Sequence, residues 1–239
     1  MQEVPKIDTV EVVGTLYIIA TPLGNLQDIT YRAIETLRQV DVVACEDTRR
    51  SIKLLNAYNI KKPLISCHGH NETKSALRIR ELLSEGKDVA YVSDAGTPGL
   101  SDPGAKLVRM AREAGFSVIP IPGPSAFSTL LSVAGLQETS VHFEGFLGIK
   151  QGKRRSRLKE LLDRNEPFVI YESVHRIEKL LLELKDLAPE RRVFIGREMT
   201  KAFEEYLEGP AVTLLARVQN HPDRKKGEYT VLVYSGKKS

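Results

Sequence analysis

The chain has 239 residues, of which 41% are hydrophobic and 28% are charged, and its net charge is +4. This length and balance exclude a disordered chain and supply enough residues for one large core or two smaller ones. The mild positive charge permits an anionic partner without requiring one. We expect a cytoplasmic protein, because no apolar run is long enough for a membrane helix and Met1–Val10 does not resemble a signal peptide. The two cysteines fit a reducing compartment.

The first half of the chain predicts a regular alternation of strands and helices. Apolar runs predict strands over Gly14–Thr21, Asp41–Cys45, Pro63–Ser66, Asp88–Val92 and Ser117–Ile121. Helical spacing predicts helices over Ile29–Gln39, Ser51–Tyr58, Glu72–Glu85 and Ala105–Ala114. Such alternation indicates a largely parallel sheet with helices on both faces.

In the second half, the connections between predicted strands are shorter. Strands are predicted over Val141–Glu144, Pro167–Tyr171, Arg191–Gly196, Phe203–Leu207 and Tyr229–Tyr234. Helices are predicted over Ser125–Ala134, Arg154–Asn165, Val174–Leu184 and Pro210–Gln219. This pattern indicates a mixed sheet. We therefore predict an α/β protein of two domains, 1–122 and 123–239, with the functional site in a cleft between them.

One loop dominates the candidate functional features. Tyr91–Gly104 (YVSDAGTPGLSDPG) leaves a predicted strand and carries three glycines, two prolines and two aspartates before a predicted helix. Such a composition gives a fixed, irregular backbone whose polar groups can face a ligand. In open α/β sheets, ligands bind at the carboxyl ends of the strands. The alternative is an ordinary surface turn, but a second loop of the same character, Pro120–Ala126, follows the next strand.

Several familiar motifs are absent from the sequence. Gly148–Lys153 is one residue short of a phosphate-binding P-loop, and Arg154 stands in place of the hydroxyl residue. The first predicted strand is followed by Ala20–Asn25 (ATPLGN), which is not a dinucleotide-binding fingerprint. ATP and NAD are therefore disfavoured. Cys45 and the Ser66–Glu72 segment, with Cys67 and two histidines, match no standard zinc spacing, and we expect no metal.

Five blocks of the chain resemble the tetrapyrrole methylase superfamily. They are Gly14–Thr48, Tyr91–Gly104, Ile121–Ala126 (IPGPSA), Gly196–Lys201 (GREMTK) and Lys226–Glu228 (KGE). Within the superfamily, the chain is similar to bacterial enzymes that methylate a cytidine ribose 2′-hydroxyl in 16S ribosomal RNA. Enzymes acting on tetrapyrroles usually carry a G-x-G-P-G-D type of first loop, so the ATPLGN loop favours the RNA branch over porphyrin substrates.

The resemblance implies a homodimeric, two-domain class III methyltransferase that binds S-adenosylmethionine (SAM) and acts on 16S ribosomal RNA or the small ribosomal subunit. Carried over by position, the SAM-binding residues are Leu23, Asp94, Thr97, Ser125, Ala126, Tyr171, Met199 and Gly227. Rigid loops suit this chemistry, because in-line methyl transfer depends mostly on orientation. Two alternatives stay open: a methyltransferase of the same superfamily with a tetrapyrrole or another small-molecule or protein acceptor, and a non-catalytic RNA-binding protein.

Two charged clusters at the ends of predicted strands supply the candidate catalytic residues. The candidates are Asp47, Arg49, Glu198 and Lys201. Each cluster also has a structural interpretation: an acidic helix cap followed by a solvated basic pair, or a salt-bridged strand end.

A ribose hydroxyl is a poor nucleophile, so either a side chain accepts its proton or the step relies on orientation and late proton loss. The candidate acceptors are Asp47, His70, Glu172, Glu198 and Lys201. A lysine base requires a lowered pKa, whereas pairing with Glu198 would keep Lys201 charged and make it an anchor.

The densest basic run is Lys150–Lys159 (KQGKRRSRLK). From it we predict RNA contacts through Lys153, Arg154, Arg155 and Arg157, because an RNA enzyme needs cations for phosphates. The alternative is a solvated helix face.

Overall fold

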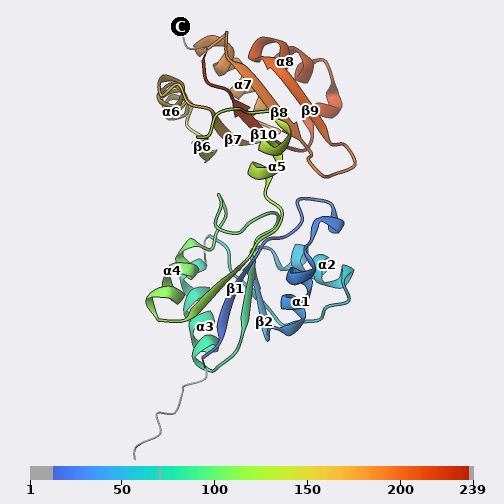
Figure 1. Ribbon diagram of the computed structural model, residues 1–239, viewed down its shortest axis with the longest axis vertical. Helices are drawn as coiled ribbons and strands as arrows, with labels where there is room; N and C mark the ends of the chain where they lie inside the picture. The colour runs from blue at the N-terminus through green and yellow to red at the C-terminus, as the bar shows by residue number, and fades with distance from the viewer. Residues whose placement is uncertain (1–12, 70, 237–239) are drawn as a thin grey trace, which may run out of the picture. The chain divides into compact units, whose positions relative to one another are not determined.

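The computed structural model describes residues 13–69 and 71–236 (Figure 1). The expectation about Met1–Val10 therefore concerns residues outside the described part. The chain forms two compact units: one runs up to Thr21 and resumes at Asp28–Gly123, and the other combines Pro22–Gln27 with the chain from Pro124 onward. The boundaries 1–122 and 123–239 stay a prediction about folding domains, because compactness does not test whether either part folds alone.

The first unit contains a five-stranded parallel sheet in the order β3-β2-β4-β1-β5. Its strands are β1 (Thr15–Ile19), β2 (Val42–Cys45), β3 (Leu64–Ser66), β4 (Val89–Val92) and β5 (Ser117–Ile121). Its helices are α1 (Tyr31–Gln39), α2 (Thr48–Ala57), α3 (Glu72–Ser84) and α4 (Ala105–Glu113). A short 3-10 turn, η1 (Leu26–Asp28), precedes α1.

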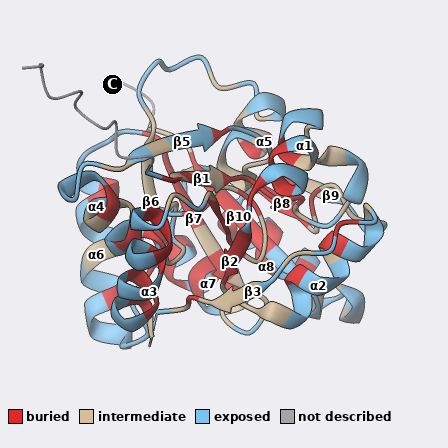
Figure 2. Cartoon of the chain, turned by 90° about the horizontal axis from the view of Figure 1, so that it is seen from below, coloured by how far each residue is buried: buried red, intermediate tan, exposed pale blue. Residues whose placement is uncertain are grey.

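The central strand β4 explains why helices cover both faces of this sheet. All four of its residues are buried. Tyr91 packs with the apolar faces of α3 and α4, while Ala90 and Val92 pack with those of α1 and α2. Side chains alternate across a strand, so a strand that is apolar throughout needs a cover on each face. In Figure 2 the buried residues accordingly gather in the strands and in the inner faces of the helices.

The second unit contains a mixed sheet in the order β6-β7-β10-β8-β9, in which only β6 and β7 pair in parallel. Its strands are β6 (His142–Phe146), β7 (Phe168–Ser173), β8 (Arg192–Arg197), β9 (Glu205–Pro210) and β10 (Glu228–Val233). Its helices are α5 (Ala126–Val133), α6 (Gln151–Asp163), α7 (Ile177–Leu187) and α8 (Ala211–Gln219), with a 3-10 turn η2 (Pro222–Lys225). The larger core lies under α6, α7 and α8, and a smaller one lies under α5.

The predicted fold class, with a parallel first sheet and a mixed second sheet, is confirmed. The main errors are at boundaries. Helices α2 and α6 begin at Thr48 and Gln151, three residues before the predicted starts at Ser51 and Arg154. Helix α7 begins at Ile177 rather than Val174, because residues 174–176 form a turn after β7. Strand β9 begins at Glu205 rather than Phe203, because Lys201–Glu204 is also a turn, closed by a hydrogen bond from the Glu204 amide to the Lys201 carbonyl. Within the described residues, no helix is both long and apolar enough to cross a membrane.

Candidate active site

The central loop, defined here as Ser93–Gly104, is fixed by its own backbone. Gly96, Gly99 and Gly104 have φ angles of 79°, 80° and 121°, and Ser101 has 67°. Glycine adopts such angles without the steric cost that a Cβ brings. At Gly104 the restriction is also spatial, because an added Cβ would lie 2.5 Å from a ring carbon of Tyr91. The sequence therefore specifies a single course for this loop after β4.

Two side-by-side contacts hold the beginning of the central loop. Thr21 and Gly96 exchange both backbone hydrogen bonds at 2.9 Å, which ties the end of the first strand to the loop. The Thr21 hydroxyl donates to the Ser93 carbonyl at 3.2 Å.

The end of the loop is held by Glu72, which lies buried in the first turn of α3. One carboxylate oxygen, Oε1, accepts hydrogen bonds from the amides of Gly104 and Lys106 at 3.0 and 3.1 Å. These amides begin α4, whose N-cap glycine has no side chain to cap them. No local motif in the sequence pairs Glu72 with residues over thirty positions away, which is why it was not among the predicted site residues.

Three carboxylates face one another around this loop. Burial first, and then the charge of Asp94, raises the pKa of Glu46. Burial and the charge of Glu46 raise the pKa of Asp102 to about 6, although a hydrogen bond with Ser93 opposes the shift. Asp94 accepts a hydrogen bond from the Asp47 amide at 3.0 Å and lies 3.4 Å from Arg50. Arg50 compensates Asp94 and Glu46 in part, and the remaining repulsion among the three carboxylates would favour a cationic ligand.

Asp47 and Arg49 form a local pair at the start of α2. Asp47 is the helix N-cap, and its carboxylate accepts hydrogen bonds from the Arg49 amide at 2.8 Å and from the Arg49 guanidinium at 2.7 and 3.1 Å. The side-chain hydrogen bonds from Arg49 lower the pKa of Asp47 to about 2. A carboxylate with such a pKa is a weak proton acceptor.

In the second unit, Lys201 is the centre of a charge network. Its ammonium donates to Glu198 and Glu228, each at 2.9 Å. Burial by itself would lower the pKa of Lys201, but the hydrogen bonds to Glu228 and Glu198 outweigh it, and the pKa is raised. The lysine is therefore an ammonium, and the pairing with Glu198 that we considered as the alternative to a base is the one in the structure.

Two glycines leave the space that the side chains of this network occupy. A Cβ on Gly24, in the first loop, would lie 2.4 Å from Cγ of Lys201. A Cβ on Gly227, whose φ is 103°, would lie 2.5 Å from Cγ of Glu198. Both glycines are thus required by packing against the charged side chains.

The other predicted cofactor residues lie in or near the smaller core of the second unit. Ser125 caps α5 in an extended conformation, and its buried hydroxyl has no hydrogen-bond partner among the described residues. Tyr171, in β7, accepts a hydrogen bond from the Phe127 amide at 3.0 Å, directly after Ala126. Met199 is buried, and its sulfur lies close to the backbone of Gly196. Leu23 and Thr97 are half-buried.

The residues of the basic run differ in exposure: some are bonded to carboxylates, and others are exposed. Arg154 is buried and donates to both carboxylate oxygens of Glu183 at 3.0 and 2.7 Å, joining α6 to α7. Arg157 is held by Glu144 at 2.7 Å and by Glu160 at 2.9 Å. A buried guanidinium with both sides bonded cannot meet a phosphate, so the RNA surface proposed below does not include Arg154. Lys153 and Arg155 are exposed.

Of the two remaining candidate proton acceptors, Glu172 and His70, the structure places only Glu172. Glu172 is buried in β7, pairs with Arg176 at 3.2 Å, and has a pKa raised by burial. His70 lies outside the described residues. Within residues 13–69 and 71–236 there is no cluster of three or more histidine, cysteine or acidic residues arranged to hold a metal ion. The two cysteines are buried free thiols.

Comparison with solved structures defines the class of this fold. The chain is similar to cobalt precorrin-4 methyltransferase, with a TM-score of 0.68 and 16% identity over 92% of this chain and 94% of that one. It is also similar to uroporphyrin-III C-methyltransferase from Thermus thermophilus, with a TM-score of 0.62 and 18% identity over 92% and 94%. At these identities the likeness establishes a shared methyltransferase fold and nothing about the acceptor.

Sequence relatives place the chain more narrowly. The model of the tetrapyrrole (corrin/porphyrin) methylases matches residues 15–215, and the chain belongs to this family. It is 48% identical to "Ribosomal RNA small subunit methyltransferase I" of Borrelia garinii over 91% of this chain and 97% of that protein. The proteins of the same name from Leptospira biflexa and Haemophilus influenzae are each 44% identical, over 95% and 96% of this chain and 93% and 81% of theirs. The chain is therefore a methyltransferase.

Proposed function

We propose that this chain transfers the methyl group of SAM to a cytidine ribose 2′-hydroxyl in 16S ribosomal RNA. The observation that carries the proposal is the 44–48% identity, over more than nine-tenths of the chain, to proteins named ribosomal RNA small subunit methyltransferase I. A tetrapyrrole acceptor has less support, because the corrin and porphyrin enzymes share the fold at only 16–18% identity.

The residues fit SAM as the methyl donor. SAM carries a sulfonium and an ammonium group, and the surplus negative charge of Glu46, Asp94 and Asp102 suits such a cation. The unpartnered, buried hydroxyl of Ser125 is a polar group that a ligand would satisfy. We propose that SAM is held by Leu23, Asp94, Thr97, Ser125, Ala126, Tyr171, Met199 and Gly227.

For the chemistry, we propose that positioning contributes more than a dedicated base. In the reaction, the ribose oxygen forms a bond to the methyl carbon, the bond from that carbon to sulfur breaks, and the hydroxyl proton is released. Asp47 has a pKa of about 2 and Lys201 has a raised pKa, so neither is suited to accept that proton at neutral pH. We assign Arg49 and Lys201 to charge anchoring, and Asp47 and Glu198 to holding those cations in place. Orientation can supply much of the acceleration.

The test of this function is transfer of a labelled methyl group from SAM to small ribosomal subunits and to free 16S ribosomal RNA, both prepared from cells that lack the gene. We expect incorporation at a single cytidine ribose, located by mass spectrometry of nuclease digests. Binding of SAM without incorporation into either RNA would remove the proposed acceptor, and absence of SAM binding in calorimetry would remove the donor.

The resemblance also supports a homodimer in the cytoplasm, which we include in the proposal. Sedimentation equilibrium should give twice the mass of one chain, 26.7 kDa, at micromolar concentration.

A further inference from the structure

The connection from β6 to α6 presents large apolar side chains to solvent. Phe146, the last residue of β6, is 55% exposed, and Ile149 is 85% exposed. We call Phe146–Lys153 the β6–α6 connection. Single exposed apolar residues are common on protein surfaces, so exposure needs support from rigidity and charge before it carries an inference.

The β6–α6 connection is held rigidly from inside the second unit. Arg176 donates to the Leu147 carbonyl at 2.6 Å and is itself paired with the buried Glu172 at 3.2 Å. The Phe146 ring meets Tyr171 edge to face, with centroids 5.7 Å apart and an angle of 68°. Because Phe146 is still 55% exposed beside this contact, much of its surface remains free for another planar group.

Helix α6 continues this rigid framework. The buried pair between Arg154 and Glu183 fixes the second turn of α6 against α7. The exposed residues of the β6–α6 connection are therefore presented in a defined arrangement, and binding them would cost little ordering of the chain.

The segment of the chain that follows Phe146 is positively charged. No acidic residue occurs between Gly145 and Lys159. Lys150 and Lys153 are exposed, and neither forms a salt bridge within the described part of the chain. The acid nearest in sequence, Glu144, is occupied by Arg157 and His142.

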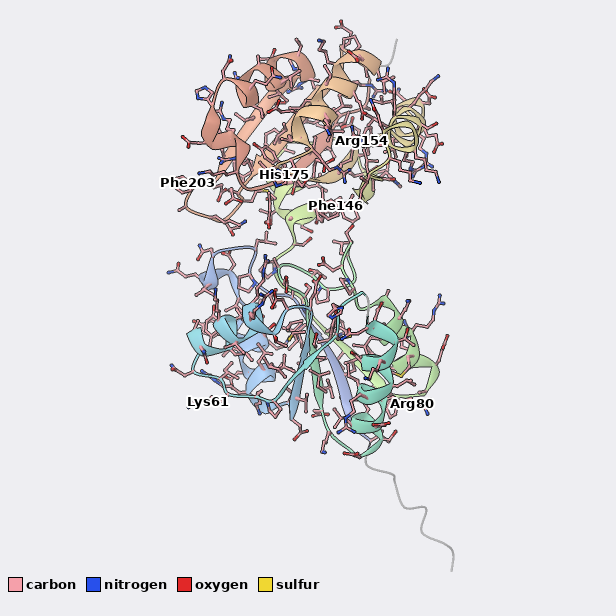
Figure 3. All side chains as sticks on the ribbon, turned by 180° about the vertical axis from the view of Figure 1, so that it is seen from behind. Lys61, Arg80, Phe146, Arg154, His175 and Phe203 are labelled. Atoms are coloured by element: carbon pink, nitrogen blue, oxygen red, sulfur yellow. The ribbon has the colours of Figure 1, made fainter. Side chains whose placement is uncertain are left out.

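A second exposed aromatic residue of the same unit provides a contrast. Phe203 is 75% exposed in the turn between β8 and β9. Its neighbours in that turn are acidic: Glu204 accepts from the Thr200 amide, and the Lys201 ammonium is already bonded to two carboxylates. In Figure 3, Phe203 lies at one side of the unit, whereas Phe146 lies near its middle. Of these two exposed aromatic residues, only Phe146 has neighbouring lysines that form no salt bridge within the described part of the chain.

We propose that the β6–α6 connection is an RNA-binding element in which Phe146 stacks on a base and Lys150 and Lys153 contact phosphates. The inference rests on the proposed function and adds to it a stacking contact outside the predicted cofactor residues. Exposed rings between cations are the usual means of holding single-stranded nucleic acid. A protein partner is less favoured, because surface lysines are depleted in protein interfaces whereas phosphates attract them.

The sharpest test uses the absence of tryptophan from this chain. Phe146→Trp introduces a single indole, whose emission should be quenched when a single-stranded 16S ribosomal RNA fragment containing the methylated cytidine is added. The matched control is Phe203→Trp, whose emission should stay unchanged. Quenching of both variants or of neither would overturn the proposal. If, without RNA, the emission of the Phe146→Trp protein changed with protein concentration, Phe146 would lie in a contact between copies of the chain. That result would also overturn the proposal.

Affinity measurements give an independent test. Phe146→Ala should weaken binding of the same RNA roughly 5- to 150-fold, the range of one base–aromatic stack. Lys150→Gln with Lys153→Gln should lower the slope of log affinity against log salt by about 1.4. The control is Lys61→Gln with Arg80→Gln, which removes the same charge from the first unit (Figure 3) and should leave the slope unchanged.

Calorimetry with SAM separates this proposal from the proposed function. All variants should bind SAM as the wild type does, which also shows that they are folded. If they bind RNA with wild-type affinity and salt slope while methylation of small subunits continues, the RNA contact is elsewhere and the proposed function stands. If the wild type neither binds nor methylates this RNA, the proposed function itself fails.

Discussion

The two units carry charge at their strand ends in different ways. In the first unit, burial raises the pKa of Glu46 and of Asp102, and the charge of Asp94 adds to both shifts, with Arg50 as a partial counter-ion. In the second unit, carboxylates are bonded to cations, as Glu198 and Glu228 both are to Lys201. A group of like charges costs stability and is retained where a ligand uses it, whereas matched pairs serve to hold loops in place. On the proposed function, the first unit would bind the cationic cofactor, and the second would present side chains rigidly.

The largest expected effect tests rigidity in the second unit. Glu183→Ala leaves the buried guanidinium of Arg154 without its partner, and we expect it to lower the free energy of unfolding by about 3 to 5 kcal/mol. Arg154→Met combined with Glu183→Leu should recover most of that loss, since no charge is left buried. The measurement is urea denaturation, with Arg155→Gln as the exposed control, expected to change stability by less than about 0.5 kcal/mol. A small effect of Glu183→Ala would show that α6 does not depend on this pair.

The next effect concerns the anchor of the central loop. Glu72→Ala removes the acceptor shared by the Gly104 and Lys106 amides, and we expect a loss of about 1 to 3 kcal/mol in stability. Because the loop is the proposed SAM site, SAM affinity should fall about tenfold at temperatures where the variant is folded. Glu72→Gln keeps one acceptor oxygen and should recover part of both losses. Wild-type SAM affinity in Glu72→Ala would separate the loop from the cofactor.

A smaller effect on stability, this time an increase, tests the group of Glu46, Asp94 and Asp102. The pKa of Asp102 is about 6 in the folded chain, above its ordinary value of 3.8. A raised pKa means that the folded state favours the protonated carboxyl, so its contribution to stability is present below about pH 4 and is lost as the pH rises through 6. Asp102→Asn should therefore stabilise the chain by about 1 kcal/mol at pH 7 and have little effect near pH 4. Denaturation at both pH values checks this, and destabilisation at pH 7 would contradict the cost assigned to burial of this charge and to its repulsion by Glu46.

The smallest expected effects are on the chemical step. Asp47→Asn preserves the helix cap, and Lys201→Met removes a cation whose pKa is raised. Each should retain single-turnover methylation within about tenfold, a barrier difference of roughly 1.4 kcal/mol, when RNA and SAM are saturating. Neither should remove a limb of the pH–rate profile. Loss of such a limb in one variant would identify that residue as the base and contradict a mechanism by positioning alone.

Local pattern was enough to predict most of the fold. Apolar runs and helical spacing predicted the main strands and helices, because the period of buried residues follows directly from strand and helix geometry. Predictions failed where a turn replaced regular structure, as at residues 174–176 and at Lys201–Glu204. There the chain direction is set by hydrogen bonds to other parts of the unit, such as that from Arg176 to the Leu147 carbonyl.

The sequence by itself determined the α/β class, the position and glycine-dependent course of the central loop, and the family to which the chain is similar. Only the tertiary structure decided what each charge does. Arg154 and Lys153 are adjacent in the same basic run, yet one is buried against Glu183 and the other is exposed. The physical reason is that a side chain's pKa and availability depend on burial and on partners far away in the sequence, such as Glu72 for Gly104 or Glu228 for Lys201, and no local pattern records those partners.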